Sequence, residues 1–243
     1  MSLLEQLVSS LPEAVVLDAY TGVFTTAVVA GLEDGALNCG LASTVRAARC
    51  SGPVSRAGEL RGAPVKEVAR FVFSGNGLEA SLGMAAINSA LPQTRCEEIN
   101  AEQILAGKAA GKTTAVIGHF PFTERLRGIA GKLLVFELNP RDGLDLPSEK
   151  IPELLPEADA VAISAMTLIN GTFEGIIKHC RPDAFKLLLG PSAPLSPLVF
   201  KHGIDVVSGT RVRDIPLLIT HLTQGANFKS LPGKTLVTMK AGK

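Results

Sequence analysis

Tryptophan is absent from the 243-residue sequence, and tyrosine occurs only once, at Tyr20. Lysine and arginine together number 24 against 23 acidic residues, which gives a formal net charge of +1, and no basic stripe is present. Nucleic-acid sites need clustered cationic side chains or stacking aromatic rings. The sequence therefore argues against a nucleic-acid partner, and a small molecule or metal ligand is the expected partner.

Long apolar runs are also absent, since no stretch of about 18 apolar residues occurs, so a membrane-spanning helix is not expected. The first residues, MSLLEQLVSSLPE, predict an amphipathic helix. They lack the basic start and the continuous apolar stretch of a secretory signal peptide. We therefore expect a cytoplasmic protein with no membrane partner.

Cysteine pairs with metal-binding spacing are missing. The four cysteines lie far apart in the sequence, at Cys39, Cys50, Cys96 and Cys180. A C-x-x-C pair is typical of structural zinc sites and of redox motifs, so neither is indicated. The four histidines show no ligand spacing either, and a metal site would have to be assembled from residues distant in sequence.

The Gly-x-Gly-x-x-Gly loop of dinucleotide-binding domains is missing as well. Gly118-His119-Phe120 stands in its place, and two bulky side chains would obstruct a pyrophosphate. Gly111-Lys112-Thr113 resembles the end of a P-loop, but it precedes a predicted strand, whereas a P-loop follows one. We expect no dinucleotide cofactor, while Glu137, near the end of the next predicted strand, leaves an adenosine-type ligand open.

The residues that are present predict two parts. Hydrophobic residues make up 46% of the chain, enough for one large core or two modest ones. In the first half, β-branched runs predict three strands, at residues 14–20, 23–30 and 39–45. Three helices are predicted to follow them, beginning near Pro64, Asn76 and Asn100. Strands followed by helices are typical of an α+β domain.

The second half changes to short apolar runs separated by segments long enough for crossover helices. Five strands are predicted there, at residues 113–118, 133–138, 160–164, 185–189 and 205–207. Apolar strands alternating with helices indicate a parallel sheet covered on both faces. The predicted fold class is α/β, with a small α+β domain at residues 1–106 and a parallel-sheet domain at residues 107–243. We expect each domain to have its own core.

Polar residues, glycines and prolines gather where the predicted strands of the second half end. Ligands of open parallel sheets bind beyond these carboxyl ends. The candidate ligand-binding residues at this edge are His119, Glu137, Asn139, Thr167, Asn170, Gly190 and Ser192. Loops between buried strands are rich in such residues for structural reasons too, so the pattern alone does not separate the two interpretations.

His119 and Glu79 are the two candidate metal ligands. An imidazole at the end of a parallel strand can bind a metal or move protons, and it can equally bind a loop carbonyl. Glu79 follows Asn76 by three residues, and we favour a capping box in which its carboxylate closes the first turn of a helix. In the alternative interpretation, Glu79 and Asn88 face the other domain, and Glu79 is a carboxylate of the cleft.

Six segments form a specific set of motifs, and the resemblance that they carry extends over most of the chain. They are residues 76–88 (NGLEASLGMAAIN), 118–122 (GHFPF), 137–140 (ELNP), 154–159 (LLPEAD), 167–172 (TLINGT) and 189–197 (LGPSAPLSP). This set resembles a prokaryotic family described as "putative heavy-metal chelation". The resemblance implies an enolase N-terminal-like domain followed by a Rossmann-like domain, with a site in the cleft between them. One departure is the segment Gly143-Leu144-Asp145-Leu146-Pro147, where the family carries Gly-Asp directly before the proline.

Three functions are compatible with these residues. The first is a binding protein that holds a metal ion or a metal-linked small molecule in the interdomain cleft, with His119 and Glu79 as ligands. The second is an enzyme acting on a nucleotide- or pterin-like substrate, with His119 as acid or base and Glu137 or Asn170 orienting the ligand. The third is an interaction module. The sequence leaves open whether a reaction is catalysed and whether the chain forms a homo-oligomer.

Overall fold

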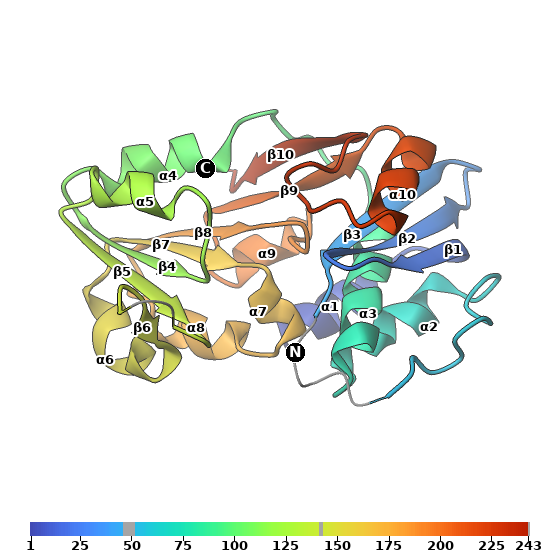
Figure 1. Cartoon of the computed structure of the whole chain (residues 1–243), viewed down its shortest axis with the longest axis horizontal. Helices are drawn as coiled ribbons and strands as arrows, with labels where there is room; N and C mark the ends of the chain where they lie inside the picture. The colour runs from blue at the N-terminus through green and yellow to red at the C-terminus, as the bar shows by residue number, and fades with distance from the viewer. Residues whose placement is uncertain (46–51, 141–142, 243) are drawn as a thin grey trace.

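The computed structural model describes residues 1–45, 52–140 and 143–242, and Figure 1 shows two sheets side by side. The smaller sheet has three antiparallel strands in the order β1-β2-β3. Their bounds are Ala14–Thr21, Thr25–Leu32 and Leu37–Ser43. Helices α1, α2 and α3 complete this part, at Leu3–Ser10, Val65–Ala69 and Gly77–Ala90.

The larger sheet has seven strands in the order β10-β9-β8-β7-β4-β5-β6, of which only β10 is antiparallel to its neighbour. The strands are β4 Thr113–Ile117, β5 Lys132–Glu137, β6 Leu146–Pro147, β7 Ala160–Ser164, β8 Phe185–Leu189, β9 Val206–Val212 and β10 Lys234–Lys240. From β4 the chain runs outward through β5 and β6, then crosses to β7 on the other side of β4. The direction of strand addition therefore reverses between β4 and β7.

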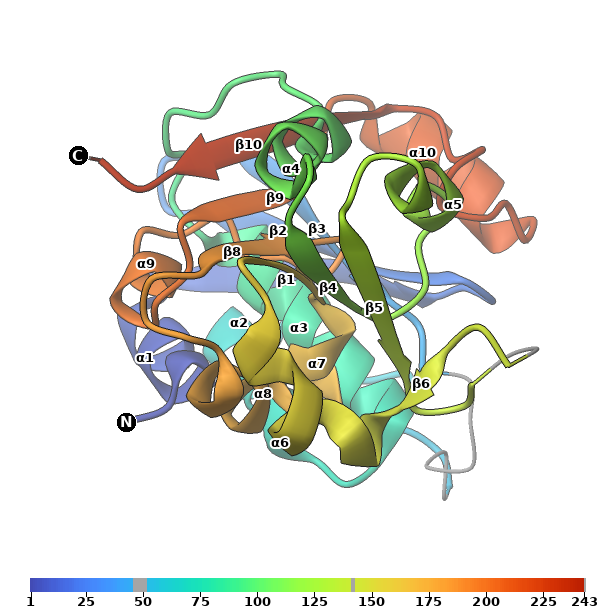
Figure 2. The same cartoon turned by 90° about the vertical axis from the view of Figure 1, so that its left-hand side faces the viewer.

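Alternate side chains along these strands face opposite sides of the sheet, and Figure 2 shows helices on both sides. On β4, Val116 packs in a cluster with Leu105 and Leu126, whereas Ala115 and Ile117 belong to the cluster on the opposite face. The first layer contains α4 (Ala101–Ala109) and α5 (Thr123–Arg127). The second contains α6 (Ile151–Leu154), α7 (Met166–Ile169), α8 (Phe173–His179) and α9 (Leu198–Lys201).

The three-stranded sheet is also covered on both faces. Val28 and Ala42 turn toward α3, in the largest buried cluster. Val29 and Leu41, the neighbours of these residues on the same strands, face the other side of the sheet. They pack with Leu218 of α10 (Ile215–Thr223) and with residues that follow this helix. In Figure 1 this helix, drawn in red, lies over β1–β3. A helix from the end of the chain therefore covers the sheet formed by its beginning.

The two halves share a core. The five strands predicted for the second half do form one sheet, and none of the described strands of the first half enters it. However, the largest buried cluster combines residues of α1 and α3 with residues of β4, β7 and α7, because α3 packs against α7. The expectation of a separate core for each half is therefore wrong.

Two glycines allow the backbone of α3 to approach its neighbours closely. A Cβ atom at Gly40, on β3, would lie 2.1 Å from the carbonyl oxygen of Ala85 and 2.1 Å from the nitrogen of Ser89. A Cβ atom at Gly83 would lie 2.1 Å from the nitrogen of Val72. Helix α3 is thus held between β3 and the 3-10 helix Arg70–Phe73 with no room for a side chain at either glycine.

The predicted α/β fold class is confirmed, and the sheet is mixed rather than fully parallel, because β10 adds an antiparallel edge. The predicted boundary between residues 106 and 107 falls inside α4, and the domain division stays a prediction. None of the helices in the described ranges combines the length and apolar character needed to cross a bilayer.

Candidate functional site

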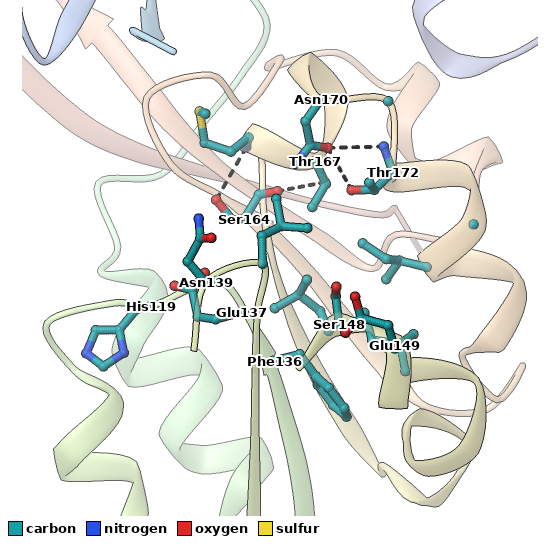
Figure 3. Close-up of a pocket in the computed structure, with 18 of the residues that line it drawn as sticks. His119, Phe136, Glu137, Asn139, Ser148, Glu149, Ser164, Thr167, Asn170 and Thr172 are labelled. Atoms are coloured by element: carbon teal, nitrogen blue, oxygen red, sulfur yellow. Dashed lines mark hydrogen bonds between the residues drawn. The ribbon is translucent and has the colours of Figure 1, made fainter. Parts of the chain in front are cut away.

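A cavity of about 780 Å³ lies at the carboxyl ends of β4, β5 and β7, where the strand order reverses. In open α/β sheets this reversal point is the usual ligand site, because the loops from the two central strands diverge there and leave a crevice. Figure 3 shows the side chains that surround the space. Five of the predicted site residues line it, namely His119, Glu137, Asn139, Thr167 and Asn170.

The loop after β4 forms one end of the cavity. Gly118 has a φ of +99°, which an L side chain rarely adopts, and its N–H donates to the carbonyl of Phe136 at 2.9 Å. The Phe120 ring folds back toward this glycine, so a Cβ atom at Gly118 would lie 3.8 Å from its Cε2 atom. Phe120 also stacks on Phe122, with 5.0 Å between ring centroids. Both rings pack in the cluster that contains Leu105 and Leu126, so this loop carries bulky side chains where a dinucleotide-binding loop has glycines.

Glu137 ends β5 beside Gly118. Its carboxylate is half-buried, and within the described part of the chain no hydrogen bond or ion pair engages it. Asn139, two residues further on, is exposed, and its side-chain amide makes no hydrogen bond to another described residue. Figure 3 shows both side chains in the space between the β4 loop and α7. Both are available to a ligand.

The end of β7 is ordered by its own hydrogen bonds. The Ser164 hydroxyl accepts from the Met166 N–H at 3.3 Å, and the Thr167 hydroxyl donates to the Ser164 carbonyl at 2.7 Å. The Asn170 Oδ1 atom accepts from both the N–H and the hydroxyl of Thr172, at 3.1 and 2.7 Å. These side chains fix the shape of the wall, which explains the Thr167–Asn170 motif structurally.

Residues of the first half close the cavity from the other side. Phe24 from the β1–β2 turn and Ser43 and Thr44 from the end of β3 line it. The two halves are tied together at this point, because the Ser43 N–H donates to the Ser192 hydroxyl at 2.9 Å and Ser192 is fully buried. Sequence reasoning missed these first-half residues, since nothing in the β-branched pattern of the two strands marks their ends as ligand-facing.

His119 lies at the edge of the cavity, beside an acidic partner. Its Nδ1 atom is 3.7 Å from Oδ1 of Asp145, whose side chain is buried. In Figure 3 the imidazole ring lies on the far side of Glu137 and Asn139 from Asn170 and Thr172. Asp145 belongs to the segment 143–147, which departs from the family pattern. That segment thus places a carboxylate beside His119.

The other predicted site residues lie elsewhere. Asn88 lines a small crevice of about 30 Å³ on the far side of α3, and its amide donates to the Leu41 carbonyl. Gly190, with a φ of +124°, belongs to the turn after β8 and lines neither described cavity. Ser192 binds Ser43, as described above. Asn88 therefore connects α3 to β3, and Ser192 connects the segment after β8 to the end of β3.

Glu79 is not brought to His119, and its carboxylate does not close a capping box either. The Oε1 atom accepts from the N–H and the hydroxyl of Ser55, at 2.7 and 2.5 Å, and the Oε2 atom accepts from the Ser74 hydroxyl at 2.5 Å. The Asn76 side chain caps α3 alone, by accepting from the Leu78 N–H at 3.0 Å. Glu79 therefore fastens the segment around Ser55 to the start of α3.

The hydrogen bonds from Ser55 and Ser74 lower the pKa of Glu79. A carboxylate of this kind adds stability above its unfolded pKa of about 4.3 and loses that contribution as the pH falls through its lowered folded value. We expect Glu79→Gln to lower the free energy of unfolding by about 2 kcal/mol at pH 7. The difference from wild type should shrink between pH 5 and pH 3, as measured by urea unfolding. Glu33→Gln, at an exposed position, is the control, and an equal loss at both pH values would contradict the assignment.

Metal-binding side chains are not clustered. Among the residues that the structure describes, no group of three or more His, Cys, Asp or Glu side chains could hold a metal ion. Burial raises the pKa of the Cys39 thiol to about 12 and that of the Cys180 thiol to about 11. Since the thiolate is the metal-binding form, these two thiols are poor ligands at neutral pH. Cys50 lies outside the described residues.

The chain matches the sequence models of a known family. Two family models carrying the description "putative heavy-metal chelation" match it, DUF364 over residues 100–240 and DUF4213 over residues 4–91. The chain belongs to this family. An uncharacterized family relative from Methanocaldococcus jannaschii is 31% identical over 154 residues, which span 60% of this chain and 59% of that protein.

Two solved structures of the DUF364 family have the same fold. A protein with unknown function from Desulfitobacterium hafniense is 25% identical, with a TM-score of 0.84 over 98% of this chain and 97% of that chain. Another protein with unknown function, from Pyrococcus horikoshii, is 20% identical, with a TM-score of 0.83 over 98% of each chain. The α/β architecture is therefore shared within the family. The relation to enolase N-terminal and Rossmann-like domains stays a prediction.

Proposed function

We propose that the protein binds a small organic molecule in the cavity at the carboxyl ends of β4, β5 and β7, and that any metal ion arrives as part of that molecule. The observation that carries this proposal is the cavity itself. Its volume of about 780 Å³ lies within the range of roughly 300–1,000 Å³ that is usual for small-molecule sites. It lies at the strand-order reversal, and residues of both halves of the chain enclose it.

The lining has the composition of an organic-ligand site. Apolar side chains form much of the wall, among them Phe24, Ile151, Met166 and Ile176. A few polar groups interrupt them, and of these the Glu137 carboxylate and the Asn139 amide have no partner within the described residues. Apolar walls provide affinity, and a small number of free polar groups provide orientation and specificity.

The family description suggests a role with heavy metals, and the geometry indicates how such a role would work here. His119 and Asp145 are close enough to offer a nitrogen and an oxygen ligand together, whereas Glu79 is engaged by Ser55 and Ser74. Two side chains leave most of a metal's coordination positions to other donors. A metal bound to the organic molecule would bring those donors with it.

A glycine on the cavity wall provides a test. Gly175, on α8, lines the cavity, and a Cβ atom there would meet nothing within 4 Å. Gly175→Leu should project into the space and prevent occupancy. Gly107→Leu is the matched control, because Gly107 is a helical glycine outside the cavity whose Cβ would also meet nothing within 4 Å. Native mass spectrometry with elemental analysis of the purified proteins measures the bound organic mass and any metal.

We expect wild type and Gly107→Leu to carry the same amount of bound organic molecule, and Gly175→Leu to lose at least nine-tenths of it. Metal, if detected, should disappear together with the organic mass. Equal occupancy in all three proteins would contradict the proposal, and metal retained without organic mass would favour direct chelation.

Catalysis is the second candidate function, and the contact between His119 and Asp145 favours it. A carboxylate beside an imidazole orients the ring, which suits a general acid or base at the edge of the cavity. The same mass spectra, recorded over time after the extracted molecule is returned to the protein, would show a changed ligand mass if the protein is an enzyme.

A further inference from the structure

We infer that the molecule bound in this cavity is a ribonucleoside without a 5′-phosphate, with its ribose hydroxyls on the Glu137 carboxylate. This inference rests on the proposed function and names the class of its ligand. Three independent features carry it: the place of Glu137 in the sheet, the lack of phosphate-binding groups in the loop after β4, and the distribution of charge along the cavity walls.

Glu137 occupies the position that holds a ribose in parallel sheets of this order. In nucleotide-binding sheets, an acidic residue ends the strand next to the first strand, about 20 residues after the glycine loop, and accepts hydrogen bonds from the ribose hydroxyls. Here β5 pairs with β4 in parallel register, with Ile117 opposite Phe136. Glu137 therefore follows directly beside Gly118, with a half-buried carboxylate that no described residue engages. Its two oxygens can accept both hydroxyls of a vicinal diol.

The same loop lacks the groups that hold a phosphate. The Phe120 N–H, which could face a phosphate, donates instead to the Thr123 hydroxyl at 3.2 Å. The Phe120 ring lies close to Gly118 and stacks on Phe122. Helix α5 has only five residues and no side-chain cap at its start, so it offers no extended set of free N–H groups. The loop therefore lacks the glycine pattern and the free N–H groups that cradle a diphosphate.

The charge of the walls excludes phosphates independently. Among the described residues that line the cavity there is no lysine or arginine, whereas Glu137 and Glu149 are both present. A phosphate dianion would be repelled by these carboxylates, with only two histidines, His119 and His179, to compensate. A neutral nucleoside is not repelled by these carboxylates.

The rest of the cavity suits a base rather than a free sugar. Ile151, Met166 and Ile176 give an apolar wall on the α6–α8 side, and a flat heteroaromatic ring buries its faces against such side chains. Free ribose has no apolar surface to cover them. Asn139, whose amide has both donor and acceptor atoms, is free to pair with the edge of a base.

Isothermal titration calorimetry on the full chain, dialysed exhaustively, tests this inference. The probes are adenosine, guanosine, cytidine and uridine, with ribose as a sugar control. For the best-binding nucleoside, the 2′-deoxy form and the 5′-diphosphate are then compared. We expect at least one ribonucleoside to bind, ribose not to bind detectably, and both altered forms to bind at least tenfold more weakly.

Glu137→Gln should weaken the ribonucleoside at least tenfold and weaken the 2′-deoxy form less, because the deoxy form has already lost one of the two hydroxyls that the carboxylate accepts from. Glu153→Gln changes an exposed carboxylate on α6 whose partner among the described residues is Lys150; this variant is the matched control and should bind as wild type. Equal binding of ribo- and 2′-deoxy forms, tighter binding of the diphosphate, or no effect of Glu137→Gln would overturn the inference.

Failure of the inference can be told apart from failure of the proposed function. If no ribonucleoside binds, yet Gly175→Leu loses the co-purified organic mass, the cavity is a ligand site of another class. If Gly175→Leu loses no organic mass, the proposed function itself fails.

Discussion

Replacing Gly40 by alanine should lower the free energy of unfolding by about 3 kcal/mol or more. The new Cβ atom would lie 2.1 Å from backbone atoms of Ala85 and Ser89, so β3 and α3 would have to move apart. Backbone cannot rotate away as a side chain can, which places this substitution among the severe cases of overpacking. For a chain of this length the melting temperature should fall by roughly 6–12 °C, as measured by calorimetry.

Gly31→Ala is the matched control for this substitution. Gly31 lies on β2 of the same sheet, and a Cβ atom there would meet only the Leu17 side chain, at 3.4 Å or more. Its melting temperature should stay within about 2 °C of wild type, because alanine in a strand also reduces the entropy of the unfolded chain. A fall of equal size in both variants would show that strand glycines as such, and not the approach of α3, are responsible.

Lys186→Met should cost about 3 kcal/mol, through the loss of three hydrogen bonds. The Lys186 side chain is only 6% exposed, and its Nζ atom donates to the carbonyls of Arg181, Pro182 and Ala184 at 3.2, 3.2 and 2.6 Å. Methionine keeps the length of the stem and removes all three donors, which leaves carbonyl groups without partners inside the protein. Urea unfolding at neutral pH measures the loss.

Lys178→Met provides the comparison for that substitution. Lys178 is exposed near the end of α8 and makes no hydrogen bond or ion pair with another described residue. We expect a change of less than about 0.5 kcal/mol there. Equal stability of Lys186→Met and wild type would mean that the turn before β8 holds its shape without the ammonium group.

Much of the second half could be predicted from its sequence. The runs at residues 160–164 and 185–189 coincide with β7 and β8, because strands buried on both faces are continuously apolar and stop abruptly at glycine or polar residues. Strand β10 escaped prediction, since Lys and Thr residues interrupt its short apolar run and its pairing with β9 depends on an antiparallel return. Strand β6 has only two residues and no pattern of its own.

The residues of the candidate site could also be predicted only in part. Glu137, Asn139 and Asn170 were accessible to sequence reasoning because strand ends in a parallel sheet share one edge, and the structure brings them to one cavity. Glu79 and Ser192 were not, because their partners Ser55 and Ser43 are set by tertiary packing between distant segments. A polar residue in a motif does not reveal whether it faces a ligand or another part of the chain.

The position of α10 over β1–β3 has a consequence for biosynthesis. Leu41 leaves the ribosome 177 residues before Leu218, which packs on the same face of the sheet. At translation rates of about 5–20 residues per second, this delay is roughly 10–35 s. During that time the outer face of the nascent sheet, with Ala27 and Val29, has no native cover and is a surface for chaperones or for aggregation. The sheet of residues 14–43 is thus completed only when the helix of residues 215–223 has been synthesised.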